Sequence, residues 1–308
     1  MNSRIRIFLL SYLVIGLLAL GLGVTLPDTM ATLAPYNTIF LGIIFFLSAL
    51  KINVSQTIDC LRDIPMVIAV VVCMLFVFAG ATFFVTEWLA PEFTVAFVLL
   101  AAMPVGMTAP LLATISGGRS ELAMTLAVVT SLLAPLTIPF VISLFLEAAV
   151  SVSFFDMFIN LSTIIFMPFL LAQIVRNYVP SFVQQIAPAV TPVSLLSLGL
   201  LITGIIAQQV LQVAEGFEFI SLTPSLFGVL LLFIIFHIVG LSVVFWHSMT
   251  DRVTISICLT YMNFSLAVYL ASEFFADGAV TLTLVVAIIP WVLLLPVFRL
   301  LTIRFLQS

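Results

Sequence analysis

Long apolar runs, separated by short polar loops, fill almost the whole of this 308-residue sequence. A helix that crosses a lipid bilayer needs about 20 mostly apolar residues. The runs predict ten such helices, at residues 5–25, 34–52, 64–87, 93–117, 120–146, 154–178, 192–212, 222–247, 253–274 and 278–304. Only 7% of the residues are charged, against about 25% in soluble proteins. We therefore expect an all-α polytopic membrane protein with the lipid bilayer as its surroundings.

Basic residues occupy alternate loops of this ten-helix arrangement. Arg4 and Arg6 precede the first helix, and the remaining basic residues lie near or after the ends of even-numbered helices: Lys51, Arg62, Arg119, Arg176, Arg252, Arg299 and Arg304. The other loops contain acidic residues but no Lys or Arg. Because loops rich in Lys and Arg stay in the cytoplasm, we predict cytoplasmic termini and a location in a bacterial inner membrane. The net charge of −4 is spread over short loops and indicates no nucleic-acid partner.

The fourth predicted helix contains a break between Met103 and Ala113. Pro104, Gly106 and Pro110 fall within it, and each proline removes a backbone donor and disfavours helix in the residue before it. At membrane depth, non-helical backbone is tolerated only where protein or a cavity surrounds it. Secondary transporters use such breaks to bind substrates or ions, whereas a proline kink without a ligand is the alternative.

The ninth predicted helix contains a second polar interruption, because Thr260, Tyr261, Asn263 and Ser265 lie near its centre. An amide in lipid is costly unless it is hydrogen-bonded, so Asn263 should face protein, water or a ligand. Hydrogen bonding between helices is the alternative to ligand binding. The segments after the two breaks would present helix N-terminal ends, which favour an anionic group. The candidate substrate-binding residues are accordingly Thr108, Ala109, Pro110, Asn263, Phe264 and Ser265.

The two breaks are related by a shift of 155 residues, which is close to half the chain. Met107 precedes Pro135 by 28 residues, and Met262 precedes Pro290 by the same 28 residues. With five helices in each half, the halves would insert with opposite orientations, as in the inverted repeats of many transporters. We therefore expect one unit over residues 1–150, with helices 1–5, and an inverted unit over 151–308, with helices 6–10.

Other polar groups inside the predicted helices are candidates for ion binding or proton transfer. His237 lies deep in the eighth helix, where an ionisable residue suggests a function such as proton coupling; a neutral histidine bound to a carbonyl is the alternative. The candidate ion-binding residues are Thr130, Ser131, Thr260, Tyr261 and Asn263. Threonine and serine can also bond to their own helix. The three cysteines have no metal-ligand spacing and no enzyme motif is present, so we expect no metal site, catalytic residue or organic cofactor.

Residues 104–135, PVGMTAPLLATISGGRSELAMTLAVVTSLLAP, resemble the bile acid/sodium symporter family, of which the chain would be a divergent member. Shared features are a proline before a break, a glycine-containing loop, and a helix bearing serine and threonine that reaches Ala-Pro. Weaker similarities lie at Phe236–His237, 257–267 and 41–44. The resemblance implies that helices 4 and 9 are broken and cross in a core of helices 3, 4, 5, 8, 9 and 10. Substrate would bind between this core and a panel of helices 1, 2, 6 and 7.

The resemblance also implies two sodium sites, but the matching positions carry different residues. The family's polar ligands are replaced by Ala109, Pro110, Ala123, Ala127, Cys258 and Met262, and in helix 3 by Cys73, Met74 or Leu75. Asn263 alone keeps a polar side chain at a matching position. We therefore expect the usual Na⁺ sites to be lost, so that sodium binding would need backbone carbonyls together with Thr108, Thr130 and Thr260.

The predicted function is secondary active transport of a small organic anion, bile-acid-like or another carboxylate, by alternating access. A proton-linked or uncoupled exporter of the arsenite- or auxin-carrier type is the alternative within transport. A membrane receptor or scaffold is the alternative outside transport, whereas an enzyme is not expected. The sequence leaves open the substrate's identity, the direction of transport and the oligomeric state.

Overall fold

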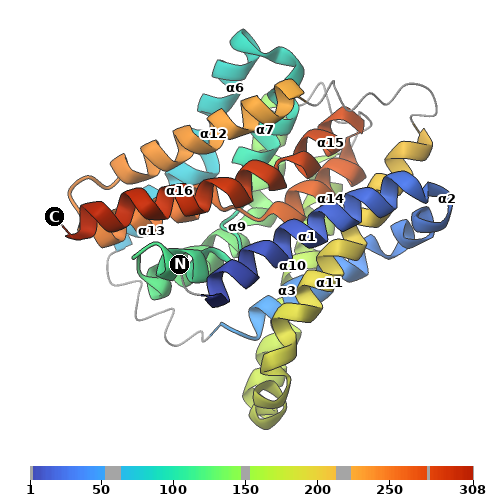
Figure 1. Cartoon of the computed structure of the whole chain (residues 1–308), viewed down its shortest axis with the longest axis horizontal. Helices are drawn as coiled ribbons and strands as arrows, with labels where there is room; N and C mark the ends of the chain where they lie inside the picture. The colour runs from blue at the N-terminus through green and yellow to red at the C-terminus, as the bar shows by residue number, and fades with distance from the viewer. Residues whose placement is uncertain (1–2, 53–63, 147–152, 213–222, 276–277, 308) are drawn as a thin grey trace.

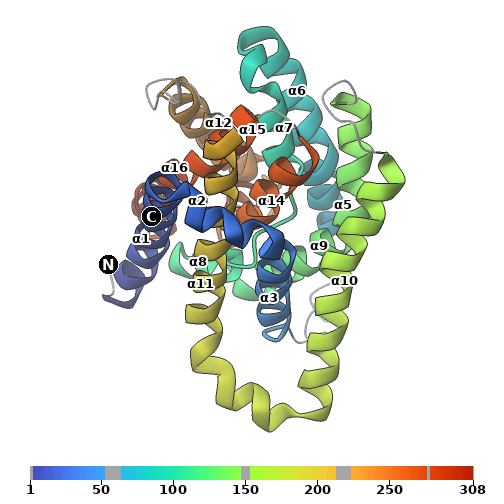
Figure 2. The ribbon, with the colours of Figure 1, turned by 90° about the vertical axis from the view of Figure 1, so that its right-hand side faces the viewer.

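The computed structural model describes residues 3–52, 64–146, 153–212, 223–275 and 278–307. All regular elements in these ranges are helices, arranged as a bundle (Figures 1 and 2). In the first half they are α1 (Ser3–Thr25), α2 (Pro27–Met30), η1 (Ala31–Tyr36), α3 (Asn37–Ala49), α5 (Ile64–Val72), η2 (Cys73–Val77), α6 (Phe78–Leu89), η3 (Pro91–Phe93), α7 (Thr94–Ala101), α8 (Ala109–Ile115) and α9 (Ser120–Phe145). In the second half they are α10 (Phe154–Tyr178), α11 (Pro180–Gln212), α12 (Thr223–Ser242), α13 (Met249–Thr260), α14 (Phe264–Phe274), α15 (Gly278–Val286) and α16 (Ile288–Gln307).

Seven stretches of the described chain are long and apolar enough to cross a membrane: residues 27–49, 64–89, 120–145, 154–178, 180–211, 224–242 and 278–302. Each overlaps one of the predicted helices, so the expectation of an all-α integral membrane protein is confirmed. The remaining predicted ranges hold α1, the pair α7 and α8, and the pair α13 and α14. The two pairs fall short in length because each is interrupted. The total of ten crossings and the inverted repeats stay predictions.

α11 begins at Pro180, whereas the sequence predicts a helix only from residue 192. A proline fits the first position of a helix, because its missing N–H would be unpaired there in any case. Pro188 and Pro192 lie inside the helix. The first turns of α11 run across one end of the molecule before the helix turns back along α3 (Figure 2). Prolines that suggest a loop in the sequence therefore accompany a bend in a longer helix.

One set of neighbouring helices consists of α1, α3, α10 and α11, which we call the α3 group. α11 packs along α1 and α3, and α3 also packs against α10. At the end of α3, the Gln173 amide donates to the Ala49 carbonyl at 3.1 Å, and the Arg176 guanidinium donates to the Leu50 carbonyl at 2.8 Å. The Ala49 carbonyl also accepts from the Ile52 N–H at 3.1 Å, so the two side chains of α10 add to the bonds made by the carbonyls at the end of α3. In the rest of the molecule α12 packs on α13, α8 on α9 and α6 on α7.

Candidate functional site

Both predicted breaks are present, and they lie against each other. Residues 102–108 separate α7 from α8, and residues 261–263 separate α13 from α14. The two segments run antiparallel and form a bridge between Val105 and Met262. We call this arrangement the crossing. Two stretches that are 155 residues apart in the sequence thus meet in space.

Hydrogen bonds across the crossing replace some of those that the helix breaks remove. The Gly106 N–H donates to the Tyr261 carbonyl at 2.9 Å, and the Asn263 N–H donates to the Pro104 carbonyl at 2.8 Å. Non-helical backbone inside a membrane protein needs such partners, because an unpaired peptide group in an apolar region costs free energy. Each break therefore stabilises the other.

Gly106 allows the two segments to approach closely. A Cβ atom at this position would lie 2.6 Å from the Tyr261 carbonyl oxygen, so a larger residue would displace backbone. The Val105 N–H donates to the Thr130 hydroxyl at 3.0 Å, and this hydroxyl donates to the Leu126 carbonyl at 2.7 Å. Thr130, a predicted ion-binding residue, thus ties α9 to the crossing.

Asn263 caps the N-terminus of α14. Its side-chain oxygen accepts hydrogen bonds from the Leu266 N–H at 3.2 Å and from the Ser265 hydroxyl at 2.9 Å. A capping asparagine satisfies one of the free N–H groups at the start of a helix. Asn263 and Ser265 are both buried, so this polar interruption is satisfied largely within the protein. Both residues also line the cavity described in the next paragraph.

A cavity of about 330 Å³ lies between the crossing and helices α3 and α11. Its walls are largely apolar, with Ile44, Phe45 and Leu198 on the side of the α3 group and Met107, Leu111 and Phe264 on the side of the crossing. Ligand sites in proteins are commonly apolar cavities of this size with a few polar groups. The cavity is therefore the candidate substrate site.

All predicted substrate-binding residues except Ala109 line this cavity: Thr108, Pro110, Asn263, Phe264 and Ser265. Ala109 is completely buried and does not line it. The sequence reasoning missed the wall made by α3 and α11, including Phe45 and Ser194. Those residues sit in ordinary apolar helices, and their position opposite the crossing depends on how distant helices pack.

One end of the cavity is polar. The polar lining residues away from the crossing are Ser48, Lys51, Thr114, Ser120, Thr191 and Ser194. Lys51 lies just beyond the apolar stretch 27–49, and burial lowers the pKa of its ammonium from the ordinary value. A signal for Lys51 does exist in the sequence, since it is the only lysine in the 308 residues.

His237 joins α12 to α13 and does not line the cavity. The Ser256 hydroxyl donates to the His237 carbonyl at 2.9 Å and lies 2.9 Å from His237 Nδ1. Because the serine proton is used for the carbonyl, Nδ1–H is the donor in the second bond. The imidazole also stacks on Phe298, with ring centroids 3.9 Å apart. These contacts indicate that His237 holds α12 against α13 and α16.

The remaining candidate ion ligands are buried next to the crossing. The Tyr261 ring packs between His237 and Trp291, with centroid distances of 5.5 and 5.2 Å. The hydroxyls of Ser131, Thr260 and Tyr261 have no hydrogen-bond partner among the described residues. Buried hydroxyls are usually paired, so these oxygens are available to a ligand or water.

The positions that match the family's sodium ligands offer few oxygen atoms. Ala109, Ala123, Ala127 and Cys258 are fully buried, and their side chains supply no oxygen. Within the described ranges, no cluster of three or more His, Cys, Asp or Glu residues could hold a metal ion. A cation at the crossing would therefore depend on backbone carbonyls and on hydroxyls such as that of Thr260.

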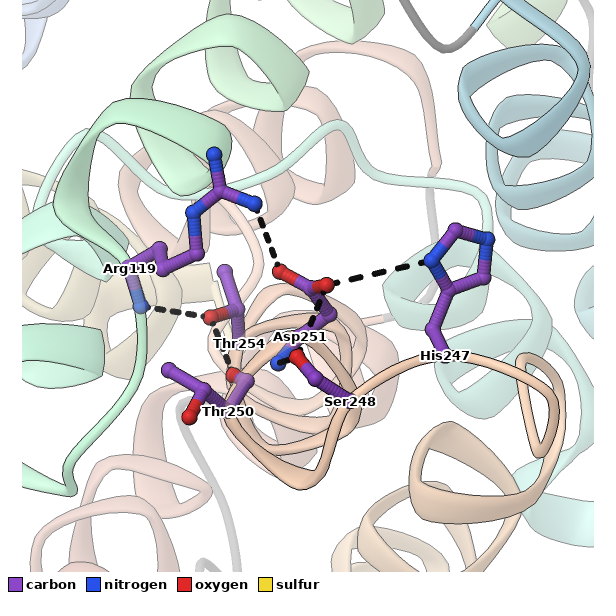
Figure 3. A network of polar contacts seen from close by, with 6 residues as sticks. All are labelled: Arg119, His247, Ser248, Thr250, Asp251 and Thr254. Carbon is purple, nitrogen blue, oxygen red and sulfur yellow. Dashed lines mark hydrogen bonds and ion pairs between the residues drawn. The ribbon is translucent and has the colours of Figure 1, made fainter.

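A polar network, absent from the sequence predictions, ties the loop before α9 to the start of α13 (Figure 3). Arg119 pairs with Asp251 at 2.9 Å, and the Arg119 N–H donates to the Thr254 hydroxyl at 2.7 Å. Ser248 caps α13: its hydroxyl accepts from the Asp251 N–H at 3.2 Å and donates to the Asp251 carboxylate at 2.9 Å. His247 Nδ1 lies 3.8 Å from the same carboxylate. The network links the two broken helices away from the crossing itself.

The C-terminal end of α8 is satisfied by α16. The Arg299 guanidinium donates to the Ile115 carbonyl at 3.0 Å, and the Thr302 hydroxyl donates to the Ser116 carbonyl at 3.1 Å. A cation at the C-terminal end of a helix also complements the helix dipole. Both ends of this short half-helix are therefore held by other parts of the chain.

Comparison with known proteins, like the two broken helices, indicates a membrane transporter. The model of the SBF-like CPA transporter family matches residues 7–305. A protein of Bacillus subtilis strain 168, described as the uncharacterized sodium-dependent transporter YocS, is 29% identical over 190 residues. The aligned part covers 60% of this chain and 56% of that protein, so the match spans just over half of the relative's length. The resemblance to bile acid/sodium symporters is confirmed, and the chain belongs to the SBF-like CPA transporter family.

Proposed function

We propose that this protein is a secondary transporter that moves a small organic anion across the membrane by alternating access. The observation that carries the proposal is the cavity at the crossing, which has apolar walls and the cation Lys51 at its polar end. Secondary transporters place their substrate sites at breaks in helices. Membership of a transporter family supports this reading and argues against an enzyme.

The proposal includes ten membrane crossings in two inverted repeats, residues 1–150 and 151–308. The α3 group would be the panel, and the remaining helices, including α7–α9 and α12–α16, would be the core. The shift of 155 residues between the two breaks supports this division. Substrate would then bind at the boundary between two bodies that can move against each other.

The charge pattern of the loops assigns the polar end of the cavity to the cytoplasm. Lys51 lies at this end, and Arg119 directly precedes the lining residue Ser120. Loops with Lys and Arg stay inside, so both termini would be cytoplasmic as well. Toward the opposite end of α3, the Thr38 and Tyr269 hydroxyls lie 3.2 Å apart and join α3 to α14. We propose that the structure corresponds to a state in which the site communicates with the cytoplasm.

Coupling in this proposal does not use the family's usual sodium ligands. The relative's description as sodium-dependent supports a cation site, whereas the alanines and the cysteine at the matching positions argue against one of the usual kind. Thermal unfolding of the purified protein in Na⁺, K⁺ or choline at equal ionic strength tests this point. A ligand at a hundredfold excess over its Kd stabilises by about 2.7 kcal/mol. We expect no sodium-specific shift, and a clear rise in Tm in Na⁺ alone would refute this part of the proposal.

Proton coupling through His237 is the second mechanism, and its burial away from the cavity argues against it. Solute counterflow in proteoliposomes, with organic acids as substrates and at several pH values, tests transport directly. We expect saturable exchange of an acid that depends on the protein. A receptor or scaffold would bind the acid without exchange, and that result would refute the transport proposal.

Asn263→Ala provides a local test of the site. We expect counterflow to fall at equal amounts of folded protein, because the substitution removes a polar cavity group and the α14 cap. Normal counterflow in this variant would show that the crossing is not part of the substrate site.

A further inference from the structure

We infer that Lys51 binds the anionic group of the transported molecule, and that the cavity selects amphipathic acids with one negative charge. The inference rests on the proposed function, since it names the residue and the substrate feature that give the site its specificity. It is carried by three observations: the place of Lys51 in the turn directly after α3, the charges of the described residues around it, and the apolar walls beside it.

Lys51, in the turn after α3, continues a stripe of side chains that α3 presents to the cavity. Ile44, Phe45 and Ser48 precede it along this stripe, and all of them line the cavity. Residues three or four positions apart lie on the same face of a helix, which accounts for the spacing from 44 to 48 and from 48 to 51. The Lys51 N–H donates to the Ser48 carbonyl at 3.1 Å, so the helical turn extends to the lysine. The ammonium therefore lies at the polar end of a wall that is apolar deeper inside.

Among the described residues, no acidic group balances the charge of Lys51 in the cavity. It is the only charged or titratable residue among the described residues that line the cavity. The other basic side chains that the structure describes each donate to a carboxylate or a carbonyl: Arg119, Arg176, Arg252 and Arg299. Lys51 differs from them because its side chain has no such partner in the described part of the chain. Lys51 is exposed and also lines the cavity, so an anion that enters from solution can reach this unpaired cation.

The apolar walls restrict what kind of anion fits. Phe45 and Leu198 face the cavity on one side, and Met107 and Phe264 on the other. A small inorganic anion would leave this surface without a partner, whereas an organic acid would bury its hydrocarbon part there. The hydroxyls of Ser48 and Ser120 can donate to the remaining oxygens of a carboxylate or sulfonate. A second charge on the ligand would find no second cation among the lining residues that the structure describes.

The single lysine of the chain makes a direct test practical. Reductive methylation with ¹³C-formaldehyde keeps the charge of an amine and would label Lys51 and the terminal amine only. Lys51→Arg identifies the Lys51 signal by its disappearance. We would titrate this signal with naphthalene-2-carboxylate, 4-phenylbutanoate and naphthalene-2-sulfonate, each beside its neutral amide. We expect at least one acid to shift the signal and raise the pKa of the labelled amine, because a nearby anion favours its charged form, with no such change for the amide.

Binding and counterflow of the same compounds complete the test. Lys51→Met keeps an unbranched apolar stem but removes the charge, so the acid should bind about tenfold more weakly or worse, with amide binding unchanged. Lys51→Arg should retain most of the acid affinity. Ser194→Ala is the matched control, because the Ser194 hydroxyl donates to the Val190 carbonyl at 2.8 Å and is not free to donate to the acid; acid binding should therefore be retained in this variant.

Two results would overturn the inference. If Lys51→Met still prefers acid over amide as the wild type does, the lysine does not bind the anionic group. The proposed transport function would not be affected by that result. If the wild type binds none of these acids, the cavity is not a site for amphipathic monoanions. The broader transport proposal then fails as well only if counterflow of other organic anions is also absent.

Discussion

Gly106→Ala tests whether the two breaks depend on each other. The added Cβ would lie 2.6 Å from the Tyr261 carbonyl oxygen, and ordinary contact begins at 3.4 Å. The two segments would have to separate by about 0.8 Å, which would stretch the 2.9 Å bond from Gly106 to Tyr261 to about 3.7 Å. A contact of that length is no longer a hydrogen bond.

The cost of Gly106→Ala follows from these distances. An unsatisfied buried backbone group costs about 1–3 kcal/mol, and overpacking adds about 1–3 kcal/mol. Alanine restricts the unfolded chain and returns about 0.4–1 kcal/mol. The net loss is therefore about 1–6 kcal/mol, and each kcal/mol lowers Tm by roughly 2–4 °C for a domain of 150–250 residues.

Thermal unfolding in detergent measures this loss, with Gly21→Ala as the matched control. Gly21 lies in α1, and a Cβ there would meet nothing within 4 Å. We expect the control to be neutral or stabilised by up to about 1 kcal/mol, since alanine is the better helix former. If Gly106→Ala unfolds at the wild-type temperature and still supports counterflow, close contact between the breaks is not required.

Three further predictions concern charged and polar groups. Acid binding should weaken as pH rises through the pKa of Lys51, because the ammonium is charged only below that pKa. Burial lowers the pKa, so the loss of binding should begin below pH 10.5. Isothermal titration calorimetry over a pH series measures this dependence, which Lys51→Arg should abolish because arginine stays charged. Asp251→Asn should lower stability by about 1 kcal/mol, a small effect because Arg119 is half exposed, and high salt should shrink the difference in Tm from the wild type. Ser256→Ala should cost about 1–3 kcal/mol by leaving His237 Nδ1–H unpaired, without changing the pH profile of counterflow; a displaced profile would restore His237 as a proton-coupling residue.

The breaks were predictable from sequence because their cause is local. Pro104 and Pro110 interrupt helical hydrogen bonding wherever they stand, and Asn263 in an apolar run signals a group that needs a partner. The shift between the breaks also predicted that they belong together. The bond from Asn263 to Pro104 was not predictable, since its partners are brought together only by the packing of the whole chain.

The opposite wall of the cavity could not be predicted for a related reason. Ile44, Phe45 and Leu198 look like any other apolar residues of a membrane helix, because lipid and a protein cavity favour the same side chains. The seventh helix was predicted to begin at residue 192 and begins at Pro180, because the first position of a helix and a loop both favour proline. The pairing of Asp251 with Arg119 could not be predicted either, because the two residues are 132 positions apart and meet only in the folded chain.

The distribution of polar contacts fits a molecule whose two parts move as units. Backbone bonds close the crossing, Arg119 and Asp251 link the broken helices, and Arg299 caps α8, all on one side of the cavity. On the other side, Gln173 and Arg176 tie α10 to α3. Hydrogen bonds are directional, so such links resist movement within each part. Across the cavity, apolar walls face each other, and apolar contact is non-directional. The boundary at which the substrate is proposed to bind is thus the one along which sliding breaks few hydrogen bonds.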